Sequence, residues 1–247
     1  MTLPFTGVRL VPGEAILRPL RVEALARYRF FAVRVPAGRV LDLGCGAGEG
    51  AAALAGERRV LAVDADVGAL AFARRYFPGP AYAAMDAERL ALADACLDGV
   101  ISVEVIEHLA HPERYLAEVG RVLKAEGVFV LTTPNRLRSS PTPGSRWPEH
   151  RREYRPAELA TLLARYFARV ELWGQAIPLY ERHPLRRVVR LLAPVVKPVL
   201  PRPLRVRALP LVQATIRADI NLEDVVFQCE QVAEQPTLVA VCREPRR

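Results

Sequence analysis

Three glycines and three carboxylates occur at spacings that would suit one ligand. The glycines follow Asp42 in Asp42-Leu-Gly44-Cys-Gly46-Ala-Gly48, and the other two acids are Asp64 and Asp86. Glycines let a backbone turn sharply and approach a ligand without Cβ atoms in the way. Read from Gly44, the loop lacks the G-x-G-x-x-G spacing of a dinucleotide fingerprint, whose helix N-terminus would hold a pyrophosphate. The spacing therefore favours a nucleoside ligand without a pyrophosphate.

The three acids offer contacts for a cationic nucleoside. Asp42, which precedes the glycines, would face an ammonium group. Asp64 can accept hydrogen bonds from both ribose hydroxyls, and Asp86 is placed to accept one from an adenine amino group. Any one of these acids alone would more often cap a helix or be a solvated charge. Their occurrence at three successive strand ends favours a binding site instead.

A second group of residues could act on an acceptor molecule. If an acceptor hydroxyl has to lose a proton, the candidate bases are Glu104, Glu107, His108 and His150. We predict that Glu107, His108 and His150 are the catalytic residues, and imidazole suits this task because its pKa is near neutrality. The alternative interpretation is that Glu107-His108 caps and orders the helix that follows.

These residues lie at the ends of the elements that the sequence predicts. From Arg39 to Thr133, short apolar runs alternate with longer amphipathic stretches, which is typical of βα units and a mostly parallel sheet. The expected strands are 40–43, 60–63, 81–84, 99–103, 128–132, 169–173 and 237–242, and the expected helices are 48–55, 67–77, 112–123 and 155–166.

The fold class expected is α/β, with three parts along the chain. Residues 1–36 would form an N-terminal lid, 37–174 with 236–247 the core, and 175–235 a basic insertion broken by prolines. In the lid, Arg27, Tyr28 and Phe31 could fold over a ligand and exclude water. The alternative is that these side chains are core contacts.

Composition is typical of a packed globular chain. Of its 247 residues, 51% are hydrophobic, and no apolar run approaches the roughly 20 residues that span a bilayer. The start of the chain does not resemble a signal peptide, so we expect a cytoplasmic protein. The four cysteines form no Cys-x-x-Cys pair, which argues against a zinc cluster or a disulfide framework.

The positive charge is concentrated in one segment. The chain has a net charge of +8, and the segment 182–207 holds eight cations and no acid. A local basic surface suggests an anionic partner. Within it, 184–193 is amphipathic, which suits either a peripheral membrane contact or a helix that covers a pocket or a subunit interface.

The stretch 40–48 together with Asp64 and Asp86 resembles the class I S-adenosylmethionine-dependent methyltransferases, and 97–109 resembles their fourth-strand motif. The resemblance covers about 39–173. It implies a Rossmann-like sheet of seven strands with the last one antiparallel, and S-adenosyl-L-methionine as the cofactor. The residues expected to bind that cofactor are Asp42, Gly44, Cys45, Gly46, Gly48, Asp64, Ala65, Asp86, Ala87 and Glu104.

Shorter sequence matches narrow the class of acceptor molecule. The segments 8–13, 26–30 and 150–159 look like bacterial methyltransferases of surface-glycan or lipid pathways, which implies transfer to a small-molecule, glycan or lipid-linked acceptor at oxygen. Glu104-Val-Ile-Glu107-His108 resembles the metal-binding E-x-x-E-H of ubiquinone-pathway and small-RNA methyltransferases. Many relatives carry part of this string without a metal, and we expect none here.

Two other functions compete with this one. The first is a binding or scaffold protein that keeps the fold without transfer, which the intact Asp42, Asp64 and Asp86 argue against. The second is RNA methylation, suggested by the basic segment. Against it, the chain has neither an Asn-Pro-Pro-Tyr type motif nor a Pro-Cys nucleophile, and the basic segment lacks interleaved aromatics. The sequence leaves the oligomeric state open.

Overall fold

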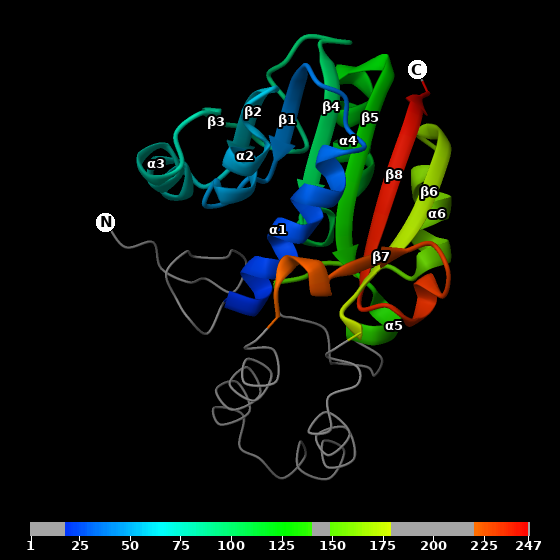
Figure 1. Ribbon diagram of the computed structural model, residues 1–247. Helices are drawn as coiled ribbons and strands as arrows, with labels where there is room; N and C mark the ends of the chain where they lie inside the picture. Colours follow the sequence, from blue (N-terminus) through cyan, green and yellow to red (C-terminus); the bar gives the residue numbers. More distant parts are fainter. Residues whose placement is uncertain (1–17, 140–148, 179–219, 247) are drawn as a thin grey trace.

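An eight-stranded sheet forms the centre of the computed structural model, which describes residues 18–139, 149–178 and 220–246 (Figure 1). The strand order is β3-β2-β1-β4-β5-β8-β6-β7. The strands are β1 Arg39–Leu43, β2 Arg59–Asp64, β3 Ala81–Ala84, β4 Leu97–Val103, β5 Leu123–Pro134, β6 Phe167–Ala176, β7 Val226–Gln228 and β8 Thr237–Pro245.

The strands β1 to β5 are parallel, and β8 runs antiparallel to both β5 and β6. The chain builds outward from β1 to β3 and then crosses to the other side of β1 to form β4. In open α/β sheets, ligands bind outside the carboxyl ends of the strands where the order reverses. The topology therefore places a ligand site at the carboxyl ends of β1 and β4.

Helices cover both faces of this sheet (Figure 1). Alternate residues of a strand face opposite ways, so Leu41 and Val40 belong to different clusters of buried side chains. The cluster around Leu41 holds side chains of α4 and α6, and the cluster around Val40 holds side chains of α1, α2 and α3. The helices are α1 Arg18–Ala32, α2 Glu49–Leu54, α3 Val67–Tyr76, α4 Pro112–Val122, α5 Arg136–Ser139 and α6 Pro156–Leu163.

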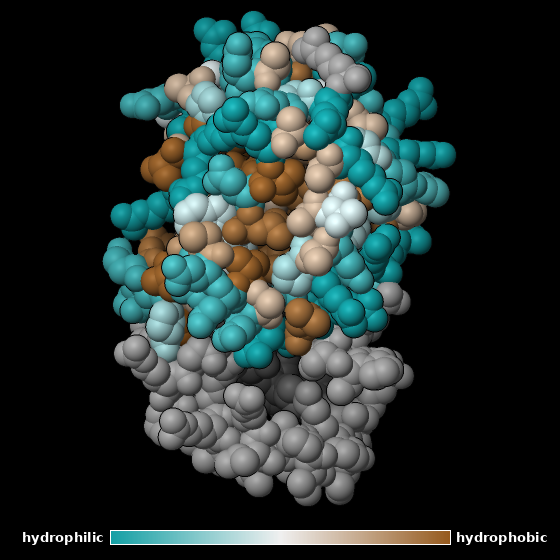
Figure 2. Space-filling model, turned by 90° about the vertical axis from the view of Figure 1, so that its right-hand side faces the viewer, coloured by the Kyte–Doolittle hydropathy of each residue, from teal (hydrophilic) through white to brown (hydrophobic). Residues whose placement is uncertain are grey.

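Edge strand β6 closes the sheet on the side opposite β3. It pairs with β8 along most of its length, but with β7 only from Gly174 to Ala176. Figure 2 shows this side of the molecule, where hydrophobic and hydrophilic side chains are mixed. Arg169, on the edge strand itself, forms an ion pair with Glu244 at 2.9 Å. Charged residues on an edge strand discourage pairing with another chain.

The predicted fold class is confirmed, with one additional strand. Every strand expected from the sequence is present, although several are longer, and β5 begins at Leu123 rather than near Val128. The eighth strand, β7, comes from the segment that was expected to be an insertion. The described ends of that segment, 175–178 and 220–235, continue β6 and form β7, and the division into three parts remains a prediction.

The basic stretch 182–207 lies outside the described residues, as do residues 1–17 of the predicted N-terminal lid. Among the helices that are described, none combines the length and the apolar character needed to cross a membrane.

Candidate active site at the carboxyl ends of the parallel strands

The loop from Gly44 to Gly48 wraps closely around the end of β1. The backbone amides of Gly44 and Cys45 donate to the carbonyl of Val63 on β2, at 2.8 and 3.0 Å. Gly44 and Gly48 have φ values of 82° and 85°, which favour glycine. A Cβ on Gly44 would lie 2.3 Å from Cγ2 of Val105. This loop therefore depends on its glycines for both conformation and space.

Asp64 ends β2 and holds the glycine loop. Its Oδ2 accepts a hydrogen bond from the amide of Gly46 at 2.8 Å, and its Oδ1 accepts one from the amide of Asp66 at 2.9 Å. A carboxylate has about four acceptor sites, so both oxygens can still accept from a ligand. The side chain is half-buried at the strand end, as a contact to ribose hydroxyls would require.

The expected adenine side lies on the neighbouring strand. Asp86 and Ala87 follow β3, which pairs in parallel with β2, and the amide of Met85 donates to the carbonyl of Asp64 at 3.2 Å. Asp86 and Ala65 are exposed, and Ala87 is half-buried. The structure thus brings Asp64, Ala65, Asp86 and Ala87 to one edge, where the acceptors and the glycine cradle fit a nucleoside.

Asp42 differs from the other two acids because it is fully buried. The hydroxyl of Tyr28, from α1, donates to its carboxylate with distances of 3.0 and 3.1 Å to the two oxygens. Burial raises the pKa of Asp42 to about 7, and the charge of Asp64 adds to this effect. In this structure the carboxylate that was expected to face an ammonium group contacts α1.

Glu104 follows β4 and also turns toward α1. It has a φ of 55°, its Oε1 accepts from the hydroxyl of Thr132 at 2.8 Å, and it forms an ion pair with Arg27 at 3.4 Å. Arg27 is buried and donates to Gln175 at 2.6 Å. Of the three residues in the E-x-x-E-H string, only Glu104 is held by Thr132 and Arg27, apart from the cluster of Glu107, His108 and His150.

Glu107, His108 and His150 are brought together at the end of β4. Each offers a ligand atom, and these three atoms lie within 4.8 Å of one another. Oε2 of Glu107 accepts from the hydroxyl of Thr133 at 3.0 Å, whereas its buried Oε1 has no hydrogen-bond partner among the described residues. Complete burial raises the pKa of Glu107 well above its usual range, and the charge of Glu104 raises it further. Burial therefore favours the neutral form of this carboxyl.

Both imidazoles are oriented through Nδ1. His108 Nδ1 lies 3.1 Å from the carbonyl oxygen of Glu149, and His150 Nδ1 lies 2.7 Å from Oε1 of Glu153. A carbonyl or a carboxylate can only accept, so Nδ1 is the donor in each contact, and Nε2 is the nitrogen that carries the lone pair whenever the ring is neutral. Burial lowers the pKa of His108, and the neighbouring His150 lowers it further. Both rings are therefore oriented with Nε2 as the nitrogen left to act on an acceptor.

Glu153 was not predicted as part of the site. It is buried, it holds His150, and its Oε2 accepts from the hydroxyl of Ser139 at 3.1 Å. The amides of Arg151 and Arg152 both donate to the carbonyl of Glu107, at 2.7 and 3.1 Å, which fixes this segment against β4. The spacing of three residues between His150 and Glu153 was a signal available in the sequence.

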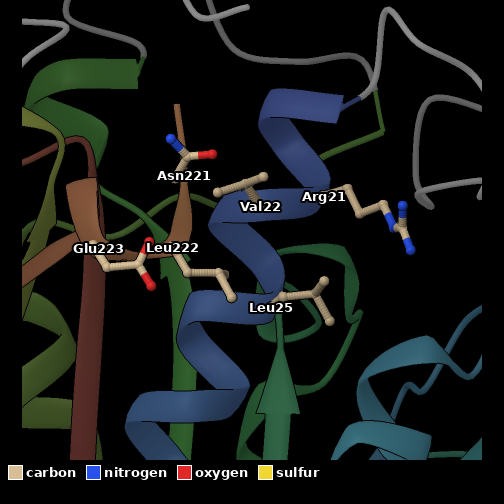
Figure 3. Close-up of a pocket in the computed structure, with 6 residues that line it drawn as sticks. All are labelled: Arg21, Val22, Leu25, Asn221, Leu222 and Glu223. Atoms are coloured by element: carbon tan, nitrogen blue, oxygen red, sulfur yellow. The ribbon is translucent and has the colours of Figure 1, made fainter. Parts of the chain in front are cut away.

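A pocket of about 340 Å³ opens beside the first turns of α1 (Figure 3). Arg21, on its wall, also donates from Nε to Glu49 of α2 at 2.7 Å, next to the glycine loop. None of the residues predicted for the site lines this pocket. Its lining residues are Arg21, Val22, Leu25, Asn221, Leu222 and Glu223.

Part of the chain is similar to known methyltransferases. Residues 41–131 match the family model described as a methyltransferase domain. A probable S-adenosylmethionine-dependent methyltransferase from Mycolicibacterium smegmatis is 38% identical over 165 residues, which cover 65% of this chain and 63% of the relative. A ubiquinone biosynthesis O-methyltransferase from Ruegeria sp. is 37% identical over 105 residues, which cover 40% of this chain and 42% of the relative. The chain therefore matches less than two thirds of the length of either relative.

The fold has a solved counterpart. A methyltransferase from Thermotoga maritima, described as a possible histamine N-methyltransferase, superposes with a TM-score of 0.64. The superposition covers 92% of each chain at 17% sequence identity. At this identity the likeness concerns the fold alone.

Proposed function

Because the chain carries a class I S-adenosylmethionine-dependent methyltransferase domain, we propose that it transfers the methyl group of this cofactor to an oxygen atom of a small-molecule acceptor. The observation that carries the proposal is the convergence of Glu107, His108 and His150 at the end of β4. That strand lies beside β1, which leads into the glycine loop. An acceptor held there would lie next to the cofactor edge.

The chain's own residues would hold the cofactor at the ends of β1, β2 and β3. The bound cofactor would supply an electrophilic methyl group on its sulfonium sulfur. The leaving group is the demethylated cofactor, which is a thioether. Asp64 accepts from the ribose hydroxyls, and Asp86 accepts from the adenine amino group. The Gly44–Gly48 loop, with the small Cys45 inside it, permits close approach of the backbone. The remaining task is to orient the acceptor and exclude water.

An acceptor hydroxyl gives up its proton as the O–C bond forms, and His150 is the base that we propose. Its Nε2 takes the proton while Glu153 keeps the proton on Nδ1 and stabilises the imidazolium that results. Such a buried carboxylate fixes both the tautomer and the ring orientation of a histidine base. His108 and the buried Glu107 form the wall beside it. The ubiquinone O-methyltransferase relative also favours oxygen as the accepting atom.

Two variants test this proposal. Asp64→Ala should weaken binding of S-adenosylhomocysteine, the demethylated product, by about 1.5–3 kcal/mol in calorimetry, because hydrogen bonds to a charged group are lost. His150→Gln should leave that affinity unchanged and lower turnover by about 10²–10⁴-fold in a screen of hydroxylated acceptors with labelled cofactor. Binding of NAD with no binding of S-adenosylmethionine would contradict the cofactor assignment. Full turnover of the His150 variant would contradict the role of the base.

A second candidate is transfer assisted by a divalent cation. It is favoured by the same three converging ligand atoms and by the buried Oε1 of Glu107, which lacks a partner. Glu153 and the carbonyl of Glu149 would then act as the outer contacts that orient the ligating imidazoles. Chelation separates the two candidates, as discussed below.

Fewer observations bear on the class of acceptor molecule. Glycan and lipid-linked acceptors are supported by the short sequence matches around 150–159, and RNA by the basic segment alone. A scaffold without activity remains the alternative from another class, and it is disfavoured by the retention of Asp42, Asp64 and Asp86. A scaffold would bind the cofactor without turnover of any acceptor in the screen. An enzyme would bind the cofactor and turn over at least one acceptor.

A further inference from the structure

The outer edge of β6 is unpaired along most of the strand. On the side away from β8, β7 pairs with β6 only at 174–176, and no other strand of the described residues pairs with 167–173 there. Ala168, Arg169 and Glu171 are exposed on this side of the molecule, which Figure 2 shows. Their stretch of β6 therefore presents a free edge, to which another strand could be added.

The hydrogen-bonding pattern shows which residues face the free edge. The amide of Arg246 donates to the carbonyl of Tyr166 at 2.7 Å, and this pair continues the register between β8 and β6. In antiparallel pairing, the residues of a strand alternate between those that bond to one neighbouring strand and those that do not. Tyr166 and Val170 therefore bond toward β8, whereas the backbone groups of Arg169 and Glu171 point outward.

The side chains along this edge divide between the two faces of the sheet. Val170 and Leu172 pack against the cluster of buried side chains that includes α6. Trp173 packs against the cluster on the opposite face. Because side chains alternate along a strand, Arg169 and Glu171 lie on the same face as Trp173. The edge thus carries apolar side chains on one face and two opposite charges on the other.

We propose that β6 pairs with β6 of a second copy of this chain, antiparallel and about a two-fold axis at Val170. In this register Arg169 lies opposite Glu171 of the second copy, so the outward-pointing backbone groups of the two strands bond to each other. Val170 meets its own counterpart, and Ala168 meets Leu172. Opposite charges and apolar side chains that face each other across two strands stabilise a sheet. Both copies contribute the same residues, as a two-fold dimer requires.

The two charges select this partner and this register. Charged residues on an edge strand discourage pairing with unrelated chains. An axis at Arg169 or at Glu171 would also satisfy the backbone pattern, but it would place like charges directly opposite, which destabilises a sheet. The axis at Val170 pairs both charges with their opposites. Arg169 contacts Glu244 at 2.9 Å, but these side chains are 70% and 50% exposed, so exchanging this ion pair costs little.

The test is sedimentation velocity of the full chain over a range of concentrations. Arg169→Glu and Glu171→Arg each place like charges opposite each other in the proposed dimer, whereas the double variant restores opposite charges. A mixture of the two single variants also restores them, between unlike copies. Glu57→Arg is the matched control, because Glu57 is an exposed acid between α2 and β2. Thermal melting verifies that each variant is folded.

We expect the unaltered protein to form a dimer, and its dissociation constant to rise at least about tenfold in each single variant. The reason is that two pairs of opposite charges become two pairs of like charges. The double variant and the mixture should dimerise within about threefold of the unaltered protein, and the control within about twofold.

Three results would overturn the inference. The first is an unaltered protein that stays monomeric at its highest soluble concentration. The second is a dimer that neither single variant weakens, which would place the contact elsewhere on the surface. The third is failure of both the double variant and the mixture to restore the dimer, which would exclude this register. The measurements need neither cofactor nor acceptor, so their outcome is independent of the proposed methyl transfer.

Discussion

The buried carboxyl of Asp42 makes cofactor binding depend on pH. Because burial raises its pKa to about 7, ionisation makes the folded state less stable as pH rises from about 4 to 7. An ammonium group bound nearby favours the ionised form instead. We therefore expect affinity for S-adenosylhomocysteine to rise about tenfold between pH 6 and pH 8, the change in the ionised fraction of a group with this pKa. Calorimetry at the two pH values measures it.

Two variants control that measurement. The hydrogen bond from Tyr28 lowers the pKa of Asp42, so Tyr28→Phe should move the rise in affinity to higher pH. Asp42→Asn should remove the pH dependence and weaken binding at pH 8. Equal affinity of the unaltered protein at both pH values would mean that Asp42 does not sense the ammonium group.

The charge of Glu107 bears on two alternatives at the histidine pair, namely a general base and a bound divalent cation. Burial raises the pKa of its carboxyl and so favours the neutral form, and Glu104 is occupied by Thr132 and Arg27. A neutral carboxyl is a poor ligand, so we expect a chelator to leave turnover unchanged. The measurement is turnover before and after EDTA, and then after Mg²⁺, Mn²⁺ or Zn²⁺. A loss that added cation restores would favour the metal-assisted candidate.

For single residues, the sequence identified candidate site residues but not the side chains that these residues contact. Asp64 and Asp86 could be located because a strand end and an acid are both local features of the chain. The contact of Tyr28 with Asp42, and that of Glu153 with His150, depend on how distant segments pack. The same applies to Glu104, which the motif grouped with Glu107 but which the structure holds against α1.

Among the elements, α1 contacts both halves of the candidate site and the core. Phe31 is fully buried, which supports the core alternative for this residue rather than a mobile lid. We expect Phe31→Ala to lower the free energy of unfolding by about 3–5 kcal/mol, the usual cost of such a cavity. Urea denaturation measures this, and Val33→Ala is the control because Val33 is 79% exposed. A change below about 0.5 kcal/mol in the Phe31 variant, the usual size for surface positions, would show that the helix does not contribute to the core.

Strands of the sheet could be predicted from the sequence where they form a long run of apolar residues. The strands around 40–43 and 237–242 are buried on both faces and appear as nearly continuous apolar runs. In contrast, β7 has three residues, and its pairing with β6 depends on a chain reversal that no local pattern specifies. The four-residue helix α5 likewise lies outside the helices expected from the sequence.

In the whole molecule, the net positive charge is concentrated in one segment, which predicts binding to anionic membranes. This binding can be tested without a substrate. The basic stretch 182–207 lies outside the described residues, and a membrane contact there is a proposal from its charge. Replacing Arg186, Arg187 and Arg190 with Gln should reduce co-sedimentation with anionic vesicles at low salt, because each cation contributes about 1 kcal/mol near such a surface. Affinity for S-adenosylhomocysteine should not change. If the unaltered protein ignores anionic vesicles at low salt, the stretch has another role.

The position of β8 has a consequence for how the protein is made. This strand is formed by residues 237–245, yet it lies between β5 and β6 and is the antiparallel partner of both. While the ribosome is still adding the residues before Thr237, the outer edge of β5 and the inner edge of β6 are both unpaired, and such edges promote aggregation. The nascent chain therefore has to wait for its last strand before the sheet can close, which makes this interval the stage at which a chaperone would matter most.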